Sequence, residues 1–236
     1  MTEHTHKQFD AEMEAIRTGV LTMGGLVETQ LARAIQLLQE DGEHDPLLDA
    51  VGADEQAINR MQVEIDQQCS QIIAKRQPAA IDLRMVLTVT KIVNDLERVG
   101  DETKKIAYRA AETAQYQRLA QVRHFDVGRA AARARETLQL ALDAFARLDV
   151  EAATEVIDLD EEIDAAFSAI MRQLISYMME DPRTISPALE IVFVAKSIER
   201  VGDHAKNIAE AVVQVVRGTD VRHQTAEQIR AETRDE

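Results

Sequence analysis

The sequence has little of what disulfide-bonded, secreted and membrane-spanning proteins require. It contains one cysteine, Cys69, no tryptophan and only 3% aromatic residues over 236 positions. One cysteine excludes an internal disulfide bond. No apolar run approaches the roughly 18 residues of a membrane-spanning helix, and the densest stretch is 191–195. The first ten residues are polar and lack the apolar core of a signal peptide. We therefore expect a cytoplasmic protein that meets a membrane only peripherally, through partners.

Positive charge is also scarce. The chain carries 42 acidic against 27 basic residues, a formal net charge of −15. Nucleic-acid binding requires a basic face that displaces counterions from phosphates. We therefore expect no nucleic-acid partner.

Residues with high helix propensity are abundant instead. Only four prolines are present, and each lies near a break in the apolar periodicity. Apolar residues recur at steps of three and four along six stretches, which predicts helices over 9–40, 47–75, 81–116, 125–148, 150–179 and 186–217. The polar tail from Thr219 to Glu236 is expected to be frayed or disordered.

The pentapeptide Glu-Arg-Val-Gly-Asp occurs twice, at 97–101 and at 199–203, so corresponding residues are 102 positions apart. The predicted helices 47–75 and 150–179 are also similar in sequence, because Glu55-x-x-Ile58-Asn59 matches Asp160-x-x-Ile163-Asp164. This duplication predicts an all-α, six-helix bundle made of two tandem three-helix repeats. We place the first repeat at 1–118, the second at 119–218 and a polar tail at 219–236, with the repeats packed as one compact unit.

The repeated carboxylates are the candidate metal ligands. On a helical projection Glu97 and Asp101 lie away from the apolar face, and Glu199 and Asp203 take the same places in the second copy. Two acidic residues one turn apart repel each other, so a cation outside the helix would compensate them. Carboxylate oxygens suit hard ions, and we expect a divalent or trivalent metal (Mg, Mn, Ca, Fe or Zn). The alternative is a solvated acidic face.

Other residues near the motifs are further candidates. The candidate additional metal ligands are Asn94, Asp95 and Glu210. Arg98 and Arg200 follow the motif glutamates and would form a surface ion pair or hold an anion such as phosphate. Gly100 and Gly202 border the apolar stripe, where a missing side chain lets another helix approach closely.

The sequence shows no catalytic constellation. There is no Gly-rich phosphate loop and no Gly-x-Ser-x-Gly, and the predicted helices contain no Glu-x-x-His pair. Cys69 lies on an apolar helical face, which favours an inert core thiol over a nucleophile. We therefore do not expect an enzyme.

The two motif helices, with Asn207-Ile208-Ala209 following the second copy, resemble those of the PhoU family over nearly the whole chain. The resemblance implies an all-α, often dimeric cytoplasmic protein that binds metal through Glu97, Asp101, Glu199 and Asp203. Lys105 stands where the second copy has Asn207, a departure that would weaken or reshape the first site.

The resemblance also implies a negative regulator of the phosphate-starvation response. Such proteins relay the state of the phosphate-specific ABC transporter, through its ATPase subunit, to the phosphate-sensing histidine kinase. Two alternatives remain open at this point. One is a regulator of phosphate transport or storage without a kinase partner, and the other is a metal-dependent phosphate-handling enzyme.

Overall fold

The structure, a computed structural model, describes residues 2–39, 45–113, 126–222 and 224–234. Its α-helices are α1 (Thr2–Gln39), α2 (Asp45–Arg76), α3 (Ala80–Thr113), α4 (Gly128–Arg147), α5 (Val150–Glu180), α6 (Ile185–Arg217) and α7 (Ala226–Arg234). The six predicted long helices are confirmed. The predicted end of the third helix at 116 and the expected repeat boundary between 118 and 119 lie outside the described residues.

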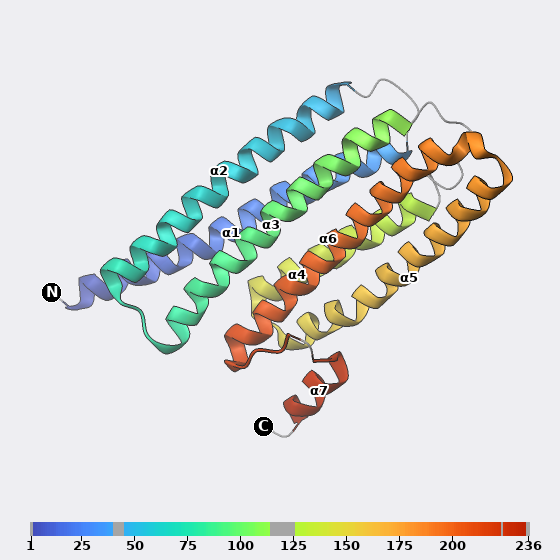
Figure 1. Cartoon of the computed structure of the whole chain (residues 1–236). Helices are drawn as coiled ribbons and strands as arrows, with labels where there is room; N and C mark the ends of the chain where they lie inside the picture. The colour runs from blue at the N-terminus through green and yellow to red at the C-terminus, as the bar shows by residue number, and fades with distance from the viewer. Residues whose placement is uncertain (1, 40–44, 114–125, 223, 235–236) are drawn as a thin grey trace.

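The third helix of each repeat lies at the centre of the molecule. In Figure 1, α3 and α6 run side by side, with α2 along the outer side of α3 and α5 along the outer side of α6. Behind them, α1 packs against α2 and α3, and α4 packs against α5 and α6. Helices α1 and α4 also touch each other, so the two three-helix repeats bury one continuous core. The predicted bundle of two tandem repeats is thereby confirmed.

One glycine lies in the contact between the repeats at the back of the bundle. A Cβ added to Gly24 on α1 would lie 2.7 Å from Leu142 Cδ2 on α4, whereas one added to Gly25 would meet nothing within 4 Å. Real Cβ atoms do not approach other heavy atoms so closely, and therefore a larger residue at position 24 would force the Leu142 side chain out of its observed position between α1 and α4.

Local sequence fixes the ends of the second-repeat helices. Leu148 adopts a left-handed conformation with φ of 52°, and the Asp149 side chain then accepts a hydrogen bond of 3.0 Å from the Ala152 amide at the start of α5. The Asp181 side chain likewise accepts a hydrogen bond from the Arg183 amide at the start of the short 3₁₀ helix Pro182–Thr184. Gly218, with φ of 79°, ends α6. Each helix thus stops where its sequence supplies a cap.

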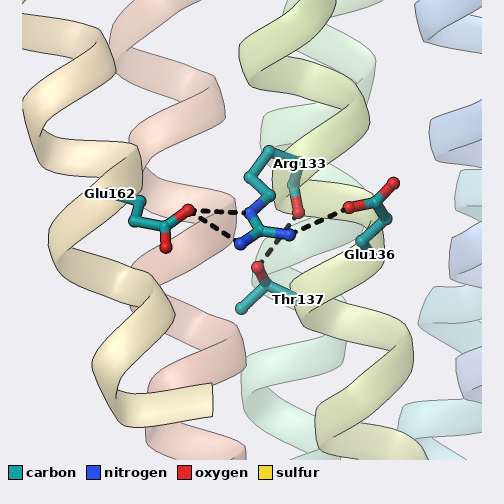
Figure 2. A network of polar contacts seen from close by, with 4 residues as sticks. All are labelled: Arg133, Glu136, Thr137 and Glu162. Carbon is teal, nitrogen blue, oxygen red and sulfur yellow. Dashed lines mark hydrogen bonds and ion pairs between the residues drawn. The ribbon is translucent and has the colours of Figure 1, made fainter. Parts of the chain in front are cut away.

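A polar network on the surface joins α4 to α5 (Figure 2). Arg133 donates to Glu162 on α5 from Nε at 3.1 Å and from Nη2 at 2.7 Å, and its Nη1 donates to Glu136 at 3.2 Å. The Thr137 hydroxyl donates to the Arg133 carbonyl at 3.0 Å. Exposed pairs of this kind contribute at most about 1 kcal/mol each, so the apolar core rather than this network holds α4 against α5.

The expectation of a frayed tail is wrong. Helix α7 packs against α5, with Val221, Ala226 and Ile229 buried. Arg217 Nη1 donates to the Ile229 carbonyl at 2.8 Å, and Arg230 pairs with Asp158 on α5 at 2.6 Å. Three apolar residues are too few to show a helical period in a polar segment, yet they are enough to dock a short helix.

Candidate functional site

The motif carboxylates of the second repeat face α5. Glu199 and Asp203 on α6 lie near Asp160 and Asp164, and we call these four residues the α5–α6 carboxylate cluster. The Asp160 side chain is only 6% exposed, and its Oδ2 accepts a hydrogen bond of 2.7 Å from Lys206. Its other oxygen, Oδ1, is buried without a hydrogen-bond partner. Glu199 is 13% exposed and accepts from Lys196 at 2.6 Å.

The first repeat builds a related cluster. Glu97 and Asp101 on α3 lie near Glu55 on α2, and we call these three residues the α2–α3 carboxylate cluster. Lys104 donates to Glu55 Oε2 at 2.5 Å, just as Lys206 donates to Asp160 in the second repeat. Since Lys104 and Lys206 are themselves 102 positions apart, the two ion pairs are copies of one another.

The helical projection located the carboxylates only in part. They lie away from the core of α3 and α6, as predicted, but they are partly covered by the second helix of the same repeat. The projection contains one helix and therefore could not show which neighbour covers its polar side. Asp203 has the largest exposed fraction of the four motif carboxylates as a whole residue, although its carboxylate group is partly desolvated by its neighbours.

Negative charge accumulates in both clusters. Burial, followed by repulsion from Glu199, Asp160 and Asp164, raises the pKa of Asp203. Burial is also the main cause of the raised pKa of Asp164 and of Glu97, with repulsion from Asp101 adding to the latter. A raised carboxyl pKa means that the ionised form is under-stabilised, so both clusters would gain from an added cation.

The donor set of the clusters fits a hard metal ion. The α5–α6 cluster sets four carboxylates against Lys196 and Lys206 and has two excess negative charges, whereas the α2–α3 cluster sets three against Lys104 and Arg98 and has one. The unpartnered Asp160 Oδ1 is a ready oxygen donor. Among the described residues, however, no three His, Cys, Asp or Glu side chains converge closely enough to share one ion. Water or an anion would have to complete the coordination.

The two motif glycines allow the second helices to approach. A Cβ at Gly100 would lie 3.3 Å from Ile58 Cδ1 on α2, and one at Gly202 would lie 2.8 Å from Ile163 Cδ1 on α5. Ile58 and Ile163 are the repeat-related isoleucines of the second helices. The predicted close packing at both glycines is confirmed, and it brings Glu55 and Asp160 up to the motif carboxylates.

The additional candidate ligands lie at the seam between the repeats. Asp95 Oδ1 is 2.8 Å from His204 Nδ1 and accepts a hydrogen bond of 3.1 Å from Asn207. Asn94 and Glu210 line a cavity of about 260 Å³ together with Asp95. Asp95 is thus held by partners from the other repeat and does not join the α2–α3 cluster.

Both motif arginines line a groove between α3 and α6. This α3–α6 groove has a volume of about 860 Å³ and is lined by Arg98 and Arg200. Arg200 Nη1 donates to Glu102 Oε1 at 3.1 Å, which is the ion pair expected for one arginine but formed across the two repeats. Lys105, the residue that departs from the second copy, donates to the same oxygen at 2.9 Å.

Sequence reasoning missed three carboxylates that share the clusters. The sequence identifies the duplicated segments that contain Glu55, Asp160 and Asp164 but does not mark these residues as part of a site. The signal was available, because polar residues repeated on both second helices have no reason to recur unless they face a repeated feature. Only the packing of α2 on α3 and of α5 on α6 shows that this feature is the motif pair.

Comparison with known proteins places this arrangement in a family. The family described as PhoU domain matches the chain twice, over residues 20–110 and 127–212. The chain belongs to the PhoU family. The two PhoU matches correspond to the two three-helix repeats. The described helices, moreover, include none that is both long and apolar enough to cross a bilayer.

Individual PhoU relatives are similar over almost their full length. The chain is 43% identical over 227 residues to the phosphate-specific transport system accessory protein PhoU homolog of Pseudomonas aeruginosa, covering 94% of this chain and 91% of that one. It is 42% identical over 228 residues to the accessory protein PhoU of Escherichia coli K12, with the same coverages.

Solved PhoU structures share the fold. The crystal structure of PhoU from P. aeruginosa superimposes with a TM-score of 0.85 at 42% identity, covering 89% of this chain and all of that one. The phosphate transport system regulatory protein PhoU from Streptococcus pneumoniae gives 0.81 at 26% identity, covering 90% and 99%. The family is one of regulatory accessory proteins, which confirms the expectation that the chain is not an enzyme.

Proposed function

We propose that this protein is a negative regulator of the phosphate-starvation response that acts in the cytoplasm as an adaptor. The observation that carries the proposal is the PhoU match over both repeats, together with relatives named as accessory proteins of a phosphate-specific transport system. By this proposal it couples the ATPase subunit of the phosphate-specific ABC transporter to the phosphate-sensing histidine kinase. It does so as a homodimer and meets the membrane only through these partners.

The proposed adaptor carries metal at its two carboxylate clusters. Glu199 and Asp203, with Asp160 and Asp164 beside them, would hold an ion in the second repeat, and Glu97 and Asp101 with Glu55 would hold one in the first. A divalent cation would balance the excess negative charge of each cluster, and water would complete its coordination. A bound ion would supply charge neutralisation, making an acidic surface compatible with an acidic partner.

A reporter of phosphate starvation tests the regulatory role. In cells lacking this gene and grown in abundant phosphate, we expect high alkaline phosphatase activity, which the wild-type gene returns to the repressed level. Glu199→Gln and Asp203→Asn together should fail to restore repression. Glu161→Gln, an exposed residue adjacent to Asp160, is the matched control and should repress normally. An unchanged reporter in the deletion strain would contradict the regulatory role.

The second candidate function is regulation of phosphate uptake without a kinase partner. It draws on the same family names, since these mention the transport system and no kinase. Measuring phosphate uptake in cells that lack the kinase separates the two. Uptake that still depends on this gene supports a direct action on the transporter, whereas uptake that no longer depends on it supports the kinase-coupled adaptor.

A further inference from the structure

The α3–α6 groove is unlike the rest of this acidic molecule. Five basic side chains line it: Arg98, Lys105, Arg200, Lys206 and Arg222. Four carboxylates line it as well: Asp101, Glu102, Asp203 and Glu210. The lining itself therefore carries one excess positive charge, whereas the whole chain carries −15. Asp160 and Asp220, which pair with Lys206 and Arg222, lie outside the lining. A concave site with this balance repels an anion far less than the rest of the acidic surface does.

Buried carboxylates hold several of these cations in position. Glu102, whose side chain is 7% exposed, accepts from Lys105 at 2.9 Å and from Arg200 at 3.1 Å, and so joins cations of both repeats. Asp160, which is 6% exposed, holds Lys206 in the same manner. Arg200 uses only Nη1 in this contact. Its remaining N–H donors are available, since a guanidinium has five.

Arg98 lies near the Glu97 carboxylate, which attracts it, but no direct contact with the described residues fixes its side chain. It is exposed in the groove, and within the described part of the chain it makes no ion pair or hydrogen bond. Its repeat-related partner Arg200 lines the same groove, so the duplication places two guanidinium groups around one space. Guanidinium groups bind phosphate oxygens in a bidentate manner, which makes a phosphoryl group the matching ligand.

A third arginine comes from the segment after α6. Gly218 turns the chain at φ of 79°, and Val221 and Ile229 anchor the segment in the core, which brings Arg222 to the groove. Gln224 and Thr225 line it there too. This segment lies beyond the second PhoU match, which ends at residue 212. Arg222 also pairs with Asp220 at 2.5 Å, a contact that orients the guanidinium.

We propose that the α3–α6 groove binds a phosphate-bearing anion between Arg98 and Arg200, and that the C-terminal segment completes the site with Arg222. The volume of about 860 Å³ exceeds what one orthophosphate ion fills and lies within the range of pockets for nucleotide-sized ligands. The ligand class is therefore phosphoryl anions. Orthophosphate, an oligophosphate chain and a nucleotide are the sources to be distinguished.

Isothermal titration calorimetry on the full chain tests the proposal. Orthophosphate, tripolyphosphate and ATP are titrated separately at neutral pH, low ionic strength and with a chelator present, so that metal at the carboxylate clusters plays no part. We expect saturable binding of at least one of them, and the one bound most tightly identifies the source. Arg98→Gln and Arg222→Gln should each weaken that binding about tenfold, the loss typical of one charge-assisted hydrogen bond.

Arg129→Gln is the matched control, since Arg129 on α4 is 84% exposed and does not line the groove. Its affinity should equal that of the wild type. Absence of binding by all three anions at millimolar concentration would overturn the proposal, and so would binding that Arg98→Gln and Arg222→Gln leave unchanged. Neither result would bear on the regulatory role, which the reporter measures separately.

Discussion

Asp95 Oδ1 on α3 lies 2.8 Å from His204 Nδ1 on α6, so this pair of side chains helps to link the central helices of the two repeats. His204 has Glu102 as its counterpart in the first repeat, and Glu102 in turn receives Arg200 from the second. The related positions 102 and 204 therefore make different polar contacts across the two helices, and Lys91–Gln214 and Arg109–Glu190 join α3 to α6 as well. Because position 204 is a histidine and its counterpart 102 is a glutamate, the interface between α3 and α6 is not symmetric.

The Asp95–His204 contact should stabilise the pairing of the repeats. Both side chains are largely buried, at 14% and 18% exposure, so His204→Ala should lower the free energy of unfolding by about 1 kcal/mol, the usual net value of one hydrogen bond. Urea unfolding measures the change. A double-mutant cycle with Asp95→Ala isolates the pair from the Asn207 contact, and strictly additive effects would show that the pair contributes nothing.

Two adjacent glycines on α1 should respond in opposite ways to alanine. Gly24→Ala places a Cβ 2.7 Å from Leu142 Cδ2 and forces this buried side chain out of its observed position, which we expect to destabilise the protein by about 1–3 kcal/mol. Gly25→Ala meets open space and should stabilise it by about 0.5–1 kcal/mol through helix propensity. Thermal unfolding of both variants measures the difference. Equal shifts would mean that the repeats do not pack as observed.

Neutralising Asp203 should stabilise the metal-free protein. The pKa of Asp203 is raised in the folded state, so the folded state keeps its proton at pH values where the unfolded chain has lost it. The free energy of unfolding therefore falls as the pH rises from about 4, the ordinary pKa of an aspartate, through the raised pKa of Asp203 in the folded state. Asp203→Asn removes this loss and should raise the Tm at neutral pH with a chelator present.

The same variant tests metal binding. Mn²⁺ should raise the Tm of the wild type, because an ion that binds only the folded state stabilises it. The increase should be smaller in Asp203→Asn, whereas Glu161→Gln should retain it in full. If Mn²⁺ shifts none of the three proteins, the carboxylate clusters do not hold this metal.

Cys69 should be chemically silent in the folded protein. It is 1% exposed, and burial, with a contribution from Asp66, raises its pKa to about 12. A thiol reagent at mildly alkaline pH should therefore label the chain in urea and leave the folded chain unlabelled. Between about pH 9 and pH 12 the thiol ionises in the unfolded chain but not in the folded one, so the free energy of unfolding should fall as the pH rises through this range. Rapid labelling of the folded protein would contradict this placement.

The helices were predictable because each carries its own signal. Apolar residues at steps of three and four define one buried face, and this pattern located the six long helices without reference to their neighbours. The short helix α7 was missed because its stability comes from contact. Ile229 is fully buried only because α7 docks on the body of the bundle.

The candidate site was predictable in its residues and not in its surroundings. The repeated pentapeptide identified the four motif carboxylates, because a duplicated polar pattern persists where both copies face the same environment. Asp160 and Glu55 lie on other helices, and the close approach at Gly202 and Gly100 is what brings them within reach.

The sequence by itself determined the helices, their duplication and the identity of the charged residues on the third helix of each repeat. Only the tertiary structure decided what those charges meet. Packing of α3 against α6 unites Arg98 and Arg200 in one groove, and docking of the C-terminal segment adds Arg222. The physical reason is that helical periodicity is a local property of the chain, whereas the partner of a surface charge depends on which distant helix packs beside it.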